Sequence, residues 1–149
     1  MSIGVRWRSN CKGDCMPEKK TIDKARQAAR EGKSPSTQAG EFVHEEIEHI
    51  RGGKHGARSA KQAIAIGLSK ARRAGVKLPV PKAGTASEET RAQARRDLAK
   101  AKEPSKPVSA KRSRAMLNKL KREGSQAASH TALSRQARAS ARARKSNAC

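Results

Sequence analysis

Aromatic side chains are almost absent from this sequence, which limits the size of the hydrophobic core that it can build. Trp7 and Phe42 are the only aromatic residues among 149, and the apolar residues are largely alanine. Burying alanine removes little apolar surface from water, whereas ordering each residue costs about 1–2 kcal/mol of backbone entropy. We therefore expect a small core, with much of the chain extended or disordered when the protein is alone.

Positive charge is the second constraining feature. The chain has 35 Lys and Arg residues against 13 Asp and Glu residues, which gives a formal net charge of +22. Such an excess indicates a polyanionic partner, and contact with nucleic-acid phosphates is its commonest use. The charge is unevenly distributed. Residues 59–84 contain six cations and no acidic residue, and residues 105–149 contain twelve cations and one acidic residue, Glu123.

Neither a membrane span nor a secretory signal is predicted. The longest apolar run, Ala63 to Leu68, has six residues and includes Gly67, whereas a membrane span needs about 18. The N-terminus has arginines but lacks the apolar segment of a signal peptide. We therefore expect an intracellular protein with no membrane partner.

The hydrophobic pattern predicts an all-α protein built around a small helical hairpin. A short polar helix is expected over residues 21–31, followed by two amphipathic helices over residues 37–51 and 59–74. The two amphipathic helices can bury their apolar stripes against each other, and no other core is predicted. The stripes consist of Ala39, Phe42, Val43, Ile47 and Ile50, and of Ala60, Ala63, Ile64, Gly67, Leu68 and Ala71.

Local signals predict where the helices begin. A serine or threonine side chain that accepts a hydrogen bond from a backbone N–H caps a helix start, and a Gln or Glu three residues later strengthens the signal. The expected caps are Ser36 or Thr37, Ser59 with Gln62, Thr85 with Glu88, and Ser109.

We divide the chain into three parts. Residues 1–15 form an irregular N-terminal extension, and Met16 is typical of a natural protein start, so we expect translation to begin there. Residues 16–84 form the small helical domain. Residues 85–149 form a basic tail rich in Ala, Lys, Arg and Ser, which we expect to be largely disordered or marginally helical because it has few bulky apolar residues to pack.

The loop from Arg51 to Arg58 is the strongest local candidate for an anion site. Its glycines permit close approach of a ligand, and it leads into a helix N-terminus, where backbone amides favour anions. An ordinary interhelical turn with solvated charges is the alternative. The cations expected to contact phosphates in this part of the chain are Lys54, Arg58, Lys61, Lys70, Arg72, Arg73, Lys77 and Lys82. Those expected in the tail are Lys111, Arg112, Arg114, Lys119, Lys121, Arg122, Arg135, Arg138, Arg142, Arg144 and Lys145.

No metal, cofactor or catalytic site is predicted. His44 and His49 are five residues apart, which places them about 140° around a helix, too far for one zinc ion. Glu46 and His49 form an E-x-x-H pattern, but the second such helix that a di-iron bundle needs is missing. The three cysteines lack the spacing of a zinc knuckle. No signature of a nucleophile with its base surrounds any Ser or His, so we do not expect an enzyme.

Glu41, Glu45, Glu46 and Glu48 make the second predicted helix acidic. We interpret them as charge balance for the basic third helix or for the tail. The alternative is that they dock a protein partner.

Three motifs lie within residues 38–79: an acidic E-F-x-x-E-E helix, a Gly-Lys-His-Gly loop and a K-Q-A-I-A-I-x-L-S-x-A-R-R-A-G helix. In these motifs the chain resembles a bacterial family of small basic proteins of unknown function, some of which carry the label plasmid stabilisation protein. Residues 111–115, 120–123 and 132–138 resemble the same group, so that the resemblance covers most of residues 17–145. It implies a bacterial source, and hence the bacterial cytoplasm, without assigning an activity to particular residues.

These observations predict a non-enzymatic, weakly sequence-specific DNA-binding protein of the nucleoid-associated, histone-like kind. Bases would find few aromatic side chains to stack on, which favours duplex DNA over single strands and over RNA-recognition folds. One alternative is an RNA-binding or ribosome-associated protein. Another is an adaptor that docks a partner through the acidic helix at residues 37–51.

Overall fold

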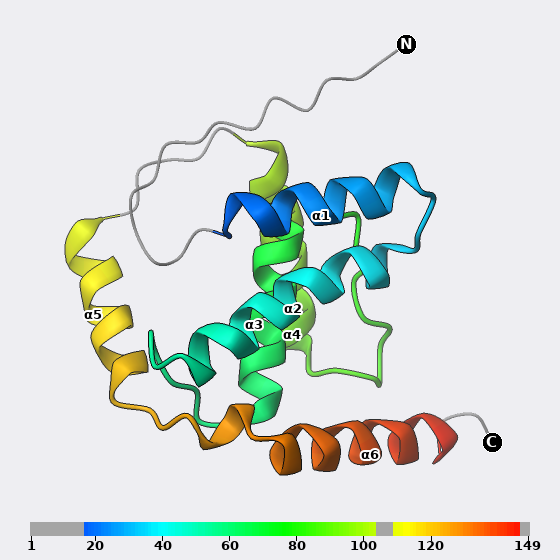
Figure 1. Ribbon diagram of the computed structural model, residues 1–149. Coiled ribbons are helices and arrows are strands. Elements are labelled where there is room, and N and C mark those ends of the chain that lie inside the picture. The colour runs from blue at the N-terminus through cyan, green and yellow to red at the C-terminus, as the bar shows by residue number, and fades with distance from the viewer. Residues whose placement is uncertain (1–16, 104–108, 147–149) are drawn as a thin grey trace.

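The computed structural model describes residues 17–103 and 109–146. Within these ranges the protein contains α-helices and one short 3₁₀ helix, η1, and no β-strand, which confirms the predicted all-α class (Figure 1). The expected N-terminal extension, Met16 and all three cysteines lie outside the described residues. The elements are α1 (Lys19–Arg30), α2 (Pro35–Arg51), α3 (Ala60–Arg73), α4 (Glu88–Lys102), α5 (Ala110–Lys121), η1 (Gln126–Ala128) and α6 (His130–Ser146).

Serine side chains cap four of these helices. Each accepts a hydrogen bond from the backbone N–H three residues further on, and the four caps are Ser34 of α2, Ser59 of α3, Ser87 of α4 and Ser129 of α6. The cap of α3 is the predicted one. The start of α2 was expected at residue 36 or 37, but Pro35 occupies its first position, where the missing proline N–H needs no partner. The start of α4 likewise differs from the expected Thr85.

The larger hydrophobic cluster lies where α1, α2 and α3 meet. Phe42 is 1% exposed and is the largest buried side chain. α2 and α3 pack against each other as predicted, but they cross steeply in Figure 1 instead of forming a simple hairpin. Gly67 permits this close crossing, because a Cβ atom at its position would lie 2.7 Å from the Cα of Val43. The cluster consists of Ala25, Ala39, Phe42, Ala71, Ala74, Val76 and Leu78.

A second cluster joins the two parts that the sequence analysis separated at residue 84. Ala127 and Ala128 of η1 are buried against Ile50, Ala57 and Ala63. α4 packs against α3 as well and buries Ala94 and Asp97. Contacts therefore cross the predicted boundary between residues 16–84 and residues 85–149. These contacts are made by alanine side chains. Alanines give no conspicuous apolar pattern in the sequence, so the contacts could not be predicted from it.

The structure does not support a disordered C-terminal tail. Residues 110–121 and 130–146 are the helices α5 and α6, although neither buries a residue. Ala, Arg, Lys and Leu have high helix propensity, and each helix is held at one end. The carbonyl of Leu120, near the end of α5, accepts a hydrogen bond from Gly56 N–H, and η1 holds the start of α6.

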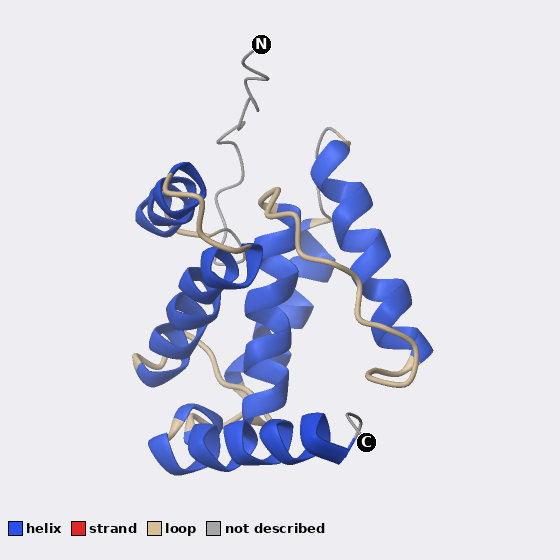
Figure 2. Cartoon of the chain, turned by 90° about the vertical axis from the view of Figure 1, so that its right-hand side faces the viewer, coloured by secondary structure: helices blue, strands red, loops and turns tan. Residues whose placement is uncertain are grey.

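In the perpendicular view, α6 lies across the end of α3 (Figure 2). None of the helices in the described ranges is long and apolar enough to cross a membrane.

Candidate nucleic-acid interface

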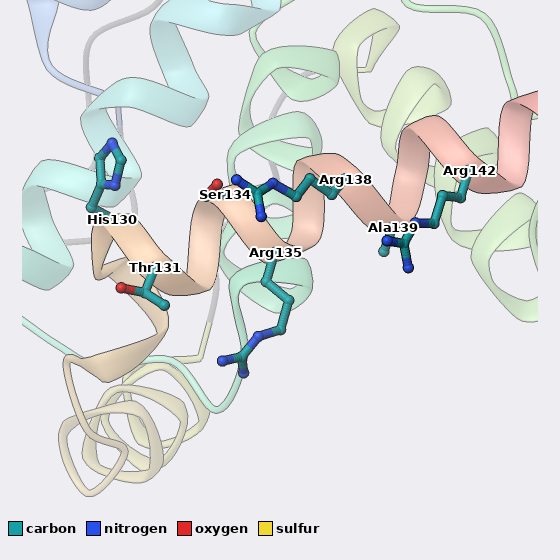
Figure 3. Close-up of a pocket in the computed structure, with 7 residues that line it drawn as sticks. All are labelled: His130, Thr131, Ser134, Arg135, Arg138, Ala139 and Arg142. Carbon is teal, nitrogen blue, oxygen red and sulfur yellow. The ribbon is translucent and has the colours of Figure 1, made fainter.

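A shallow groove along α6 gathers arginine side chains on one face of the helix (Figure 3). Arg135, Arg138 and Arg142 follow one another at spacings of three and four residues, which keeps them on the same side of a helix. Figure 3 shows the Arg138 side chain extending toward Ser134 and that of Arg142 extending toward Ala139. We call this surface the arginine groove. Its lining residues are His130, Thr131, Ser134, Arg135, Arg138, Ala139 and Arg142.

The predicted tail cations all face solvent. Neither α5 nor α6 contains an acidic residue, and within the described ranges no Lys or Arg of these two helices forms an ion pair. Their charge is therefore available to an external polyanion. These exposed cations are Lys111, Arg112, Arg114, Lys119, Lys121, Arg122, Arg135, Arg138, Arg142, Arg144 and Lys145.

The structure also places some of the predicted cations between Lys54 and Lys82 next to those of the C-terminal helices. Arg58 and Lys61 are exposed at the N-terminal end of α3, and this end packs against η1 and α6. Lys77 and Lys82 are exposed as well, but they follow the opposite end of α3 (Figure 1). The sequence could not show this division, because it depends on how α6 crosses α3.

Lys70 and Arg72 are buried, which corrects the prediction that they contact phosphates. Lys70 is 7% exposed and donates to Glu46 Oε2 at 2.6 Å. Arg72 is 9% exposed, and its Nε has no hydrogen-bond partner in the described part of the chain. Burial lowers the pKa of Arg72, and the nearby Asp97 only partly offsets this effect. The two residues lie on different sides of α3, because Lys70 meets Glu46 of α2 whereas Arg72 lies near Asp97 of α4.

Lys54 and Arg73 are exposed but already paired with carboxylates. Lys54 Nζ lies 3.0 Å from Glu18 Oε1, and this hydrogen bond is the main cause that lowers the pKa of Glu18. Arg73 Nε lies 2.9 Å from Oδ1 of Asp97, which is only 1% exposed. A phosphate would have to compete with these carboxylates. Sequence counting missed both pairs because the acidic partners come from other segments.

The loop from Arg51 to Arg58 is an interhelical turn whose amides are largely occupied. The N–H groups of Gly52, Gly53 and Lys54 donate to carbonyls of α2. Those of Gly56 and Ala57 donate to Leu120 and Gly124, at 2.9 and 3.2 Å, and that of Arg58 donates to the Gln62 side chain. These hydrogen bonds leave the loop amides largely unavailable to an anion, which agrees with the alternative interpretation of an ordinary interhelical turn.

The acidic residues of α2 do not form an open docking face. Glu45 is 6% exposed and Glu46 is 1% exposed. Glu41 lies 3.9 Å from Lys24, and Glu48 lies 3.2 Å from Arg51. The interpretation of these residues as internal charge balance agrees with these contacts.

The sequence did not predict one buried cluster of polar side chains. Glu46 and His49 of α2 lie beside His55 of the following loop, and one potential ligand atom from each lies within 4.8 Å of the other two. The two imidazole rings meet edge to face, with centroids 6.1 Å apart. The E-x-x-H pattern at Glu46 and His49 was the available signal, but only the fold brings a histidine of the Gly-Lys-His-Gly loop to it.

Residues 18–82, which include α1 to α3, match the model of a family described as a family of unknown function, DUF6496. No curated protein and no solved structure gives a significant match to the chain.

Proposed function

We propose that this is a non-enzymatic DNA-binding protein of the bacterial nucleoid that binds the phosphate backbone with little sequence preference and compacts DNA in a histone-like way. The observation that carries the proposal is the exposed cationic surface of α5 and α6, whose Lys and Arg residues have no acidic partner in the described ranges. When unpaired Lys and Arg side chains neutralise DNA phosphates, the counterions that were bound to those phosphates are released.

The arginine groove has dimensions that suit a phosphate backbone. Arg135 and Arg142 are separated by seven residues, or about 10 Å of helix at 1.5 Å per residue. The phosphates of one DNA strand follow one another at a spacing of a few ångströms, so a segment of this length can reach more than one of them. The hydroxyls of Thr131 and Ser134 in the same groove can donate further hydrogen bonds to phosphate oxygens.

The side chains present favour duplex DNA and disfavour base reading. Phe42 is the only aromatic residue in the described ranges and is fully buried, so it offers no platform for a splayed base. Apart from His130, the other residues of the groove are small, and contacts from arginine to phosphate carry no sequence information. We expect weak sequence preference for this reason.

The experiment measures binding of a fluorescently labelled duplex by anisotropy at several salt concentrations. If the protein neutralises 6–10 phosphates, its affinity falls by about 10³–10⁵ between 50 and 200 mM salt. An affinity independent of salt contradicts the proposal. Structured RNA is the competitor at fixed salt, and clearly tighter binding to RNA than to duplex DNA would replace DNA with RNA as the partner.

A pair of variants with equal charge tests the site. Replacing Arg135, Arg138 and Arg142 together by Ala should reduce the slope of log affinity against log salt by about 2–3, since each lost phosphate contact contributes about 0.9. The control replaces Lys19, Lys20 and Arg30, three exposed cations of α1, by Ala. Equal loss of affinity in both variants would mean that net charge alone, and not the groove, determines binding.

A further inference from the structure

The buried cluster of Glu46, His49 and His55 has the composition and closeness of a metal-binding site. Glu46 and His49 are three residues apart on α2, which places them on one face of the helix. His55 reaches the same point from the loop between α2 and α3. All three side chains are buried, with exposures of 1%, 8% and 6%. Two imidazole nitrogens and a carboxylate oxygen are the donor set of many zinc sites.

The orientation of His55 is the first argument for a cation. Its Nδ1 lies 3.3 Å from the carbonyl oxygen of Gly56 and donates to it in the tautomer that carries the proton on Nδ1. Its Nε2 faces Glu46 Oε1 at 3.3 Å. In that neutral tautomer Nε2 and Oε1 are both acceptors, and a cation between them would satisfy both. A histidine that ligates a metal typically donates its other N–H to a backbone carbonyl in this way.

The two oxygens of Glu46 have separate roles. Oε2 accepts a hydrogen bond from the buried Lys70 ammonium at 2.6 Å, whereas Oε1 faces the histidine. Lys70 therefore fixes the carboxylate and leaves Oε1 for a ligand. Ligating carboxylates are commonly held by such a hydrogen bond from a neighbouring group.

Glu45 supplies an independent observation. Its Oε1 lies 3.8 Å from His49 Nε2 and accepts a hydrogen bond from the Glu18 backbone N–H. Its Oε2 is buried and has no hydrogen-bond partner among the described residues. A buried carboxylate oxygen without a partner is costly, and a cation beside His49 would offset that cost.

We propose that Glu46, His49 and His55 bind one divalent transition-metal ion of the zinc class. Imidazole nitrogen favours Zn²⁺ over Mg²⁺ and Ca²⁺, which prefer oxygen ligands alone. All three ligands are buried, and they come from α2 and from the loop that follows it. The ion would attach the loop to α2, and through the hydrogen bond from Gly56 to Leu120 it would strengthen the attachment of α5.

The test uses the untagged full-length chain with Cys11, Cys15 and Cys149 replaced by Ser, so that thiols cannot bind metal. The metal-free protein is titrated with Co²⁺, followed by its visible d–d absorption, and Zn²⁺ is then added in competition. We expect one Co²⁺ per chain in a tetrahedral environment, displacement by one Zn²⁺, and no displacement by Mg²⁺ or Ca²⁺. Absence of Co²⁺ and Zn²⁺ binding at micromolar concentrations overturns the proposal.

Single substitutions locate the ion. His55→Ala should abolish the Co²⁺ spectrum, whereas His44→Ala, which removes an exposed histidine of the same helix, should leave it unchanged. Circular dichroism establishes that each variant keeps its helices. Should His55→Ala unfold, His55→Gln replaces it, and a wild-type spectrum in the folded variant overturns the assignment. Loss of the spectrum in His44→Ala also overturns it, because the ion would then lie elsewhere.

Discussion

The buried ion pair between Lys70 and Glu46 predicts a large and selective loss of stability when its cation is removed. The Nζ and Oε2 atoms lie 2.6 Å apart, and the side chains are 8% and 1% exposed. Lys70→Met removes the charge and keeps an unbranched side chain of similar length. It leaves the buried Glu46 without its cation, beside the imidazole of His55 at 3.3 Å.

The expected magnitude follows from this geometry. Two unit charges at this separation attract each other by about 6 kcal/mol if the effective dielectric constant is about 20. The net loss is smaller than this attraction, because Met no longer has to be desolvated as an ion. Breaking one side of a buried pair typically costs about 3–5 kcal/mol. We expect a decrease of that size in the free energy of unfolding.

Urea unfolding followed by far-ultraviolet circular dichroism measures this decrease. The matched control is Lys61→Met, which removes an exposed cation from the same helix and should change stability by about 0.5 kcal/mol or less. The double variant Glu46→Gln with Lys70→Met should recover part of the loss, because it removes the unpaired carboxylate. If Lys70→Met costs no more than Lys61→Met, the buried pair does not exist and the reasoning is wrong.

Other contacts give predictions that the same unfolding experiment checks. Gly56→Ala should destabilise the protein by about 1–3 kcal/mol or more, because its Cβ would lie 1.9 Å from the Glu123 carbonyl oxygen; an unchanged midpoint would contradict the docking of this loop. Asp97→Asn should cost about 1.5–3 kcal/mol, because it weakens the charge-assisted hydrogen bond from Arg73 to a buried carboxylate, and a neutral effect would place that carboxylate in solvent. Since hydrogen bonds lower the pKa of Glu18 below its usual 4.5, its contribution is present above that pH and is lost as the pH falls through the lowered pKa. Glu18→Gln should therefore reduce the loss of melting temperature on acidification below pH 4.5, and an unaltered pH profile would exclude the ion pair.

The all-α class and several helix ends could be predicted because their causes are local. Ser59 caps α3 through a hydrogen bond to the backbone three residues away, so both partners are visible in one short stretch of sequence. Gly75 follows α3 with φ of +92°, a backbone conformation that other residues rarely adopt. Phe42 could be assigned to the core because it is the bulkiest apolar side chain in the stripe of its helix.

The charge available to a partner was decided by the tertiary structure. Lys61 and Lys70 lie on the same helix and looked equivalent in the sequence, but one faces solvent and the other meets Glu46, 24 residues away. The candidate metal-binding cluster likewise forms only when the loop that carries His55 folds back onto α2. Composition therefore determined that the protein carries a large positive charge, because charge is a sum over residues. Packing determined which cations remain free, because an ion pair depends on distances between segments that sequence order does not set.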